Sequence, residues 1–312
     1  MDNSILGLHH ITAIAGDAQR NYDFYTKVMG LRMLKKTVNF DDPKTYHFYF
    51  GDRVGTPGSI LTFFPWPGVK QGKNGTGMAT GIGYSVPEGS LEFWKERFER
   101  FNVPMNEISN KFGEDFLAFQ DPDGLKLELI IAENKDIRIP WETEDVKAEV
   151  AIKGFHNVTL TLNDRKATAE ILTDIFGYEL VGTENNLFRF KTNAVENAAI
   201  VDILEDPSAG IGQTAGGTNH HVAFRVKDEE TQMAFRKKII QKGLQITEKI
   251  NRDYFFSLYF REPGGVLFEI ATDNPGFATD ETLEELGSNL QLPERYKGAR
   301  AQIEKALPEL KQ

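Results

Sequence analysis

Two histidine doublets constrain the fold of this chain more than any other feature. His9-His10 and His220-His221 each stand near the start of a stretch of alternating or β-branched residues, which predicts a β-strand. A turn-like pair of residues follows each strand, and helical patterns then run over 21–28 and 230–241. A strand, a helix and further strands that start twice from a histidine doublet indicate a repeated unit.

The repeated unit occurs four times along the chain. An aspartate and a glycine follow His10 at seven and twenty positions, and the same residue types follow Asn157 at the same offsets. Residues 119–128 parallel residues 260–269, with a hairpin turn of Pro-Asp-Gly or Pro-Gly-Gly before a final glutamate. The repeat that starts near Gly81 is weaker. The sequence therefore predicts an α+β fold of four βαβββ units, near 7–66, 77–133, 152–206 and 217–273.

Composition limits the chemistry that this chain can use. Its 312 residues contain no cysteine, which excludes disulfides, a thiolate nucleophile, an iron–sulfur cluster and a zinc ribbon. A net charge of −10 argues against nucleic acid as a partner. We see no secretory signal and no apolar run of about 18 residues, so we expect a cytoplasmic protein without a membrane span.

The predicted domain organisation follows the repeats. Units one and two occupy 1–133, a polar linker occupies 134–151, units three and four occupy 152–274, and a helical C-terminal tail occupies 275–312. Within the tail, charged helical patterns cover 280–288 and 294–307.

The four units resemble the vicinal oxygen chelate superfamily, which includes glyoxalases and extradiol dioxygenases, over nearly the whole chain before the tail. The resemblance implies two open mixed-sheet barrels, each made of two units, and one divalent metal held by first and last strands. The corresponding positions are His10, Gly81, Asn157 and His221 in the first strands, and Phe63, Glu128, Asp202 and Glu269 in the last strands. Only the pairing of units one and four supplies two histidines and a carboxylate, with Phe63 as a blank fourth position.

His156 is the alternative ligand to His10. It would form a triad with His221 and Glu269 if units three and four were paired. It stands one residue out of register, where a regular strand turns the side chain to the opposite face, although a bulge would turn it back. We therefore favour His10.

Three other polar residues are given structural roles. Glu128 and Asp202 are left without a histidine, so we expect them to be hydrogen-bonded or solvated strand residues. For His47 we favour an ordinary sheet position over a place in the cavity wall.

Residues 8–12, 219–221 and 252–269 carry a closer resemblance, to the hydroquinone ring-cleaving dioxygenases of bacteria. This resemblance implies Fe(II), or Mn(II) in its place, bound by His10, His221 and Glu269, a set that leaves positions open for substrate and O2. It also implies substrate-contacting or supporting roles for His9, Thr12, His220, Arg252 and Tyr259. His9 or His220 would pass a proton if it faced the cavity. Strand alternation instead directs both away from the metal, which suggests that they fix a neighbouring loop or the tautomer of a ligand.

The predicted function is therefore an Fe(II)-dependent dioxygenase that cleaves a hydroquinone- or catechol-type aromatic ring with O2, in degradation or detoxification. One alternative is a metal-dependent lyase or isomerase of the glyoxalase kind, which the apolar Phe63 disfavours. Another is a non-catalytic resistance protein that binds an aromatic compound, which the complete ligand set disfavours. A homo-oligomer is left open by the sequence.

Overall fold

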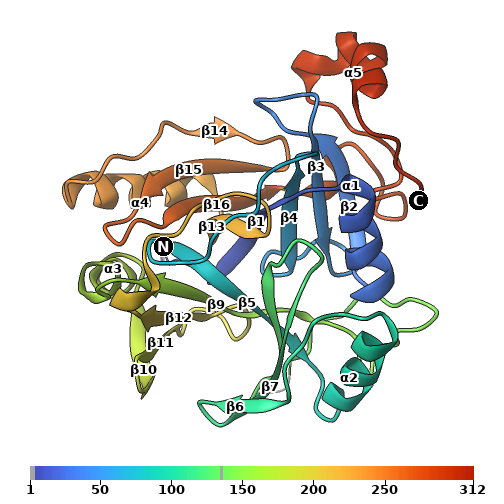
Figure 1. Ribbon diagram of the computed structural model, residues 1–312. Helices are drawn as coiled ribbons and strands as arrows, with labels where there is room; N and C mark the ends of the chain where they lie inside the picture. Colours follow the sequence, from blue (N-terminus) through green and yellow to red (C-terminus); the bar gives the residue numbers. More distant parts are fainter. Residues whose placement is uncertain (1–3, 134–135) are drawn as a thin grey trace.

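The computed structural model describes residues 4–133 and 136–312, so residues 134 and 135 of the predicted linker lie outside the described part. Within that part, the strands form two eight-stranded sheets (Figure 1). The first sheet contains, in spatial order, β14 (Ile250–Asn251), β15 (Phe255–Arg261), β16 (Leu267–Pro275), β13 (Thr218–Val226), β1 (Leu8–Ala15), β4 (Ile60–Pro65), β3 (Tyr46–Gly51) and β2 (Arg32–Val38). The second contains β10 (Tyr178–Glu184), β11 (Leu187–Thr192), β12 (Ile200–Glu205), β9 (Gly154–Leu162), β5 (Met78–Val86), β8 (Lys126–Ile131), β7 (Glu114–Gln120) and β6 (Ser109–Lys111).

Short helices flank the two sheets. The α-helices are α1 (Ala18–Asp23), α2 (Leu91–Arg100), α3 (Lys166–Glu170), α4 (Glu229–Gln241) and α5 (Arg300–Ala306). The π-helical turns η1 (Phe24–Val28) and η2 (Ile171–Ile175) extend α1 and α3, and the 3₁₀ turns are η3 (Pro207–Ala209), η4 (Phe277–Thr279) and η5 (Glu294–Ala299). In Figure 1, α1 and α2 lie on one flank and α3 and α4 on the other. None of the helices in the described residues is long and apolar enough to cross a membrane.

Each sheet is formed by two units that come from different halves of the chain. The first and fourth units form the first sheet, with β1 and β13 antiparallel at its centre. The second and third units form the second sheet, with β5 and β9 at its centre. Within each unit the first strand pairs in parallel with the last, as β1 does with β4 and β13 with β16. The predicted α+β fold of two open mixed sheets is confirmed.

The aspartate and the glycine of the sequence repeat mark the two ends of a helical segment. The Asp17 and Asp228 carboxylates each accept the backbone N–H three residues further along, at 2.7 and 2.9 Å. Such an N-cap contributes about 1 kcal/mol of stability, because it satisfies a donor that the helix leaves unpaired. After the helix, Gly30 and Gly177 have φ of 65° and 76°, a left-handed conformation that glycine adopts without a Cβ clash.

The tail packs against the first unit, but less of it is helical than predicted. Residues 280–288 form turns, and the helical structure of the tail is confined to η4, η5 and α5. The carboxylate of Glu281 accepts the Nζ–H of the buried Lys35 at 2.6 Å and the backbone N–H of Asn289 at 3.2 Å. The chain therefore folds back around this carboxylate, and the helix predicted over 280–288 does not form.

Candidate metal centre

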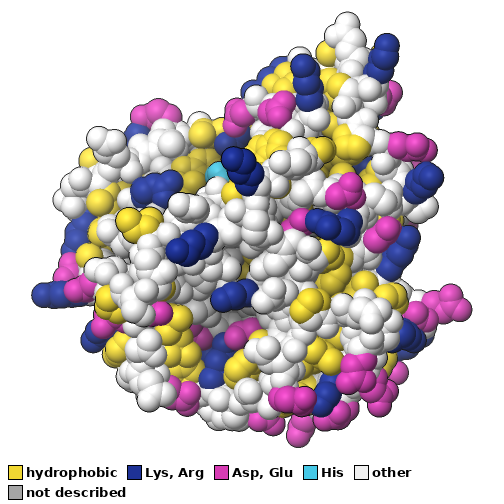
Figure 2. Space-filling model, viewed as in Figure 1, with side chains coloured by type: hydrophobic (Ala, Val, Ile, Leu, Met, Phe, Trp, Pro, Cys, Tyr) yellow, Lys and Arg dark blue, Asp and Glu magenta, His cyan; other side chains and the backbone are white. Residues whose placement is uncertain are grey.

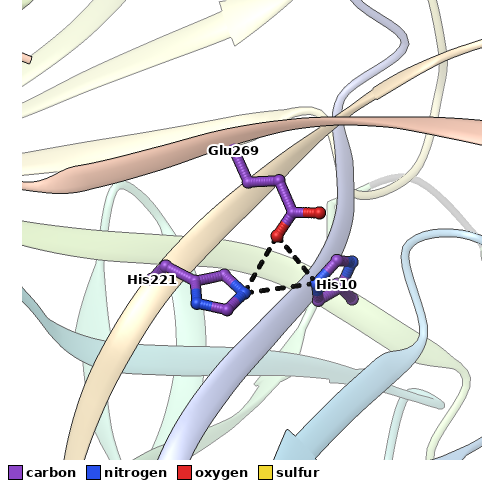
Figure 3. Close-up of side chains that lie close together, drawn as sticks. All are labelled: His10, His221 and Glu269. Atoms are coloured by element: carbon purple, nitrogen blue, oxygen red, sulfur yellow. Dashed lines mark hydrogen bonds and ion pairs between the residues drawn. The ribbon is translucent and has the colours of Figure 1, made fainter. Parts of the chain in front are cut away.

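The first sheet brings His10, His221 and Glu269 together from the neighbouring strands β1, β13 and β16. The Nε2 atoms of His10 and His221 lie 3.2 and 3.0 Å from Glu269 Oε2, and 3.4 Å from each other (Figure 3). All three side chains are buried, and very little histidine surface is visible on the face drawn in Figure 2. In the part of the chain that the structure describes, this is the one group of three or more potential metal ligands that converges.

The geometry of these atoms fits a shared cation. Glu269 Oε2 is buried and makes no hydrogen bond, although both histidine Nε2 atoms lie at ion-pair distance. A buried carboxylate oxygen without a partner is costly, and a cation among the three atoms would satisfy it. Ligands about 2.1 Å from an ion and at right angles to one another are about 3 Å apart, close to the separations found here.

The protonation states also suit a metal. Burial alone would raise the pKa of Glu269, but the two adjacent histidines hold it well below its usual range. Burial lowers the pKa of His221. An ionised carboxylate and a neutral imidazole are the forms that coordinate metal ions.

A β-bulge at each histidine doublet sets the direction of its side chains. In their shared register, β1 and β13 each carry one extra residue, and these residues are His9 and His220. A bulge re-aims a side chain that strand alternation would send to the opposite face. His9 Nδ1 consequently lies 2.9 Å from His10 Nδ1, and His220 Nδ1 lies 2.8 Å from His221 Nδ1. The bulges therefore place His9 and His220 against the imidazoles of the two candidate ligands.

The other predicted site residues lie around the same three ligands. Thr12 Oγ1 is 2.8 Å from His221 Nε2. Tyr259 is paired with Glu269 across the β15–β16 hairpin, and its ring lies edge-on to that of His221 with centroids 5.5 Å apart. The Nε–H of Arg252 donates to the Tyr259 hydroxyl at 3.3 Å. Burial alone would lower the pKa of Arg252, but Tyr259 and Glu269 raise it, so the guanidinium is a partly buried cation.

A cavity of about 250 Å³ opens beside the ligands. Its wall is largely aromatic, with polar groups between the rings. Besides His10, Thr12, His220, His221, Arg252 and Tyr259, it contains Asn39, Phe40, Asp41, His47, Tyr49, Phe64, Trp66, Phe255 and Leu267. Cavities of about 560 and 420 Å³ lie along the second sheet. They are larger, but the convergent ligand group lies at the smaller one, which is therefore the candidate site.

His47 and Tyr49 on β3 line the wall and were not predicted as site residues. His47 Nε2 lies 3.1 Å from Thr62 Oγ1, its Nδ1 lies 3.0 Å from the Tyr49 hydroxyl, and Thr62 in turn contacts Thr12 at 2.8 Å. The favoured interpretation of His47 as an ordinary sheet position is therefore wrong. The signal was present in β3, where His47 and Tyr49 alternate with phenylalanines that face the core.

Thr62, and not Phe63, occupies the fourth position of the ligand set. Glu269 pairs with the residue two positions after His221, the ligand in its first strand. Thr62 pairs with Thr12, which is two positions after His10, so Thr62 is the equivalent residue of the first unit. The Phe63 ring lies on the opposite face, in the core, with its centroid 4.6 Å from that of Tyr25. A slip of one residue in register reverses the face of every side chain, which explains the error. The fourth position still lacks a carboxylate or an imidazole.

The second sheet carries a charge network at the corresponding place. His156, the alternative ligand, lies there with its Nε2 2.9 Å from Glu114 Oε2. The Arg189 guanidinium bridges Glu114 and Asp202, with Nε donating to Asp202 at 2.8 Å. Burial alone would raise the pKa of Glu114, but His156 and Arg189 lower it to about 2. As predicted, Asp202 and Glu128 are hydrogen-bonded strand residues, the latter to Lys111.

Comparison with known proteins identifies the family. The model of the Glyoxalase/Bleomycin resistance protein/Dioxygenase superfamily matches residues 7–129 and 154–270. The chain belongs to this superfamily. Three relatives resemble it over almost their full length. A Bacillus subtilis (strain 168) protein, provisionally named ring-cleaving dioxygenase MhqO, is 46% identical over 98% of this chain and 97% of its own.

The other two relatives extend the comparison. The chlorohydroquinone/hydroquinone 1,2-dioxygenase of Sphingobium indicum is 34% identical over 95% of this chain and 94% of its own. A crystal structure of a Bacillus subtilis protein, provisionally described as a dioxygenase, has a TM-score of 0.95 at 45% identity and covers 99% of this chain and 98% of its own. These three relatives, which match nearly the whole chain, are named dioxygenases, which supports a dioxygenase enzyme.

Proposed function

We propose that this protein is an Fe(II)-dependent dioxygenase that cleaves the ring of a hydroquinone-type aromatic. The observation that carries the proposal is the convergence of His10, His221 and Glu269, with one unsatisfied carboxylate oxygen, beside an aromatic cavity. Two histidines and one carboxylate are the donor set of non-haem iron oxygenases, and Mn(II) accepts the same ligands. The full-length similarity to a hydroquinone 1,2-dioxygenase supports this substrate class.

The proposed reaction combines one hydroquinone with one O2. A ring carbon–carbon bond next to a hydroxyl-bearing carbon breaks, and both oxygen atoms remain in the open-chain product, so no further reductant is needed. Removal of a hydroquinone before it oxidises to a thiol-reactive quinone gives the reaction a role in degradation or detoxification.

The side chains of the cavity have separate tasks in this reaction. His10, His221 and Glu269 would hold the ion, which, when bound, places the aromatic hydroxyl and O2 side by side and lowers the pKa of that hydroxyl. The partly buried Arg252 cation stabilises negative charge on the substrate. The hydroxyls of Thr12 and Tyr259 hydrogen-bond to the substrate oxygens, and the rings of Phe64 and Phe255 exclude water and pack against the substrate ring.

A lyase or isomerase of the glyoxalase kind is less well supported. The four-ligand metal site expected for such members would need a donor at the first-unit position, which here is the Thr62 hydroxyl. That hydroxyl is already engaged with Thr12 and His47.

The test is oxygen uptake after anaerobic loading with Fe(II). We expect the loaded protein to consume one O2 per hydroquinone, and the variant His10→Ala to lose both bound iron and oxygen uptake. His156→Ala is the matched control, since this histidine lies in the second sheet, and it should keep both. Bound iron without oxygen uptake on hydroquinone or catechol would remove the proposal, and full iron content in His10→Ala would remove the ligand assignment.

A further inference from the structure

The loop between β2 and β3 forms part of the cavity wall of the candidate site. Asn39, Phe40 and Asp41 all line the cavity, and the Phe40 side chain is buried. Two guanidinium groups lie near the Phe40 ring, with centroid distances of 5.7 Å to Arg252 and 5.9 Å to Arg295. Asp41 Oδ2 lies 3.8 Å from Arg252 Nη1. This loop therefore contacts one of the proposed substrate-binding residues directly.

The C-terminal tail holds this loop from outside. The backbone carbonyl of Phe40 accepts the hydroxyl of Tyr296 at 2.8 Å and also the guanidinium of Arg295. Both donors belong to η5, more than 250 positions further along the chain. In Figure 1 the tail and the loop before β3 lie at the same end of the molecule. Hydrogen bonds within the loop are local, such as the backbone N–H of Asp41 donating to Asn39 Oδ1 at 2.9 Å.

The same tail also holds the segment that carries Arg252. Asp280 accepts the Tyr254 hydroxyl at 2.8 Å through one carboxylate oxygen and the Lys35 Nζ–H at 2.6 Å through the other. Tyr254 follows Arg252 by two residues in the fourth unit, whereas Lys35 belongs to β2 of the first unit. The tail thus adds a further connection between the two units beside the cavity.

We propose that the tail completes the candidate site, with Tyr296 and Arg295 acting as positioning residues that hold Phe40 over the cavity. The inference rests on the proposed function in one respect: the molecule to be retained is a single-ring aromatic, which packs against the Phe40 ring. The effect of the tail on access to the metal ligands does not depend on catalysis. With Phe40 in place, small molecules in the solvent reach the metal ligands slowly, and a displaced Phe40 opens the way.

The experiment measures access to the metal and substrate affinity separately. The variants are Tyr296→Phe, which removes only the hydroxyl, the double variant Tyr296→Phe/Arg295→Gln, and Phe40→Ala. Lys297→Gln is the matched control, because Lys297 is an exposed tail residue whose ion pair is with Glu294. For each protein we would follow the capture of Fe(II) by a coloured chelator, and then KM and kcat for hydroquinone.

We expect the double variant and Phe40→Ala to release Fe(II) to the chelator about 2- to 10-fold faster, the effect of one or two lost hydrogen bonds. KM should rise by a similar factor, with kcat changed less than KM. Lys297→Gln should behave as the wild type. Unchanged chelator rates and KM values in all three variants would overturn the proposal. If the wild-type protein consumes no O2, the proposed function fails, whereas the chelator rates still decide the role of the tail.

Discussion

The Nδ1 atoms of His9 and His10 lie 2.9 Å apart, although adjacent residues of a regular strand point to opposite faces. The second doublet repeats the arrangement at 2.8 Å. One of the two nitrogens in each pair must donate the proton. If His10 and His221 donate, their Nε2 atoms carry the lone pair that faces Glu269, as a metal ligand requires. The bulges would then serve to fix the tautomers of the ligands.

Loss of His9 should therefore weaken metal binding without removing a ligand. His9 does not line the cavity, so its effect on the metal can be separated from contact with a substrate. We expect His9→Ala to lower the Fe(II) affinity by about 10- to 100-fold while saturating iron still fills the site. A competition titration with a chelator measures this. His156→Ala, the bulged histidine of the second sheet, is the control, and equal affinities in the two variants would contradict the tautomer argument.

Ser257 should matter for the same site through Glu269. Its hydroxyl donates to Glu269 Oε1, the oxygen that does not face the histidines. A hydrogen bond to a charged group contributes about 1.5–3 kcal/mol, so Ser257→Ala should reduce metal affinity by about 10- to 100-fold. Ser59→Ala removes another buried hydroxyl next to the same sheet, bonded to a backbone carbonyl, and should leave the affinity unchanged. Isothermal titration with Mn(II) would reveal the difference.

Arg189 should be a stability residue and not a site residue. Its removal would leave the buried carboxylates of Glu114 and Asp202 without their cation, which typically costs about 3–5 kcal/mol. We expect Arg189→Met to lower the free energy of unfolding in urea by about this amount and to keep its iron. Arg300→Met breaks an exposed pair with Glu304 and should cost less than about 1 kcal/mol. If both variants lost a similar amount of unfolding free energy, the Arg189 ion pairs would not be more shielded from water than the exposed Arg300 pair.

Acid should destabilise the metal-free protein through its buried histidines. Burial lowers the pKa of His9 and of His47 well below 6.5, and that of His220 to about 3. Between the folded and unfolded pKa values the unfolded chain binds protons that the folded chain does not. Stability is therefore complete above about pH 6.5, the unfolded value, and falls as the pH decreases towards the folded pKa.

The variant His47→Gln isolates one of these groups, because three hydrogen bonds, through Thr62 and Thr12, separate its side chain from the ligand His221. We expect its melting temperature to drop less between pH 7.5 and pH 5.5 than that of the wild type, measured without metal by differential scanning calorimetry. Parallel curves for the two proteins would mean that His47 is protonated in the folded state.

The repeat made much of the site predictable from the sequence. The offsets that relate His10 to Asp17 and His221 to Asp228 reflect a strand followed by a capped helix, which is local structure. The face of a side chain was harder to predict. The bulges at His9 and His220, and the true register of Thr62, depend on how two strands pair, and one residue of slip reverses a face.

The sequence by itself determined the four units, the aspartate caps that start two of their helices, and which unit pair has two histidines and a glutamate to offer. These features depend on the periodicity of hydrophobic residues and on the spacing of residues within one segment, and both can be read directly from the sequence. Only the tertiary structure decided that β1 lies beside β13 and that the tail reaches Phe40. It also placed the Arg189 guanidinium in the second sheet where the first sheet has its candidate metal site. Those contacts join residues far apart in the chain, and they form because buried polar groups must find partners wherever the packed sheets place them.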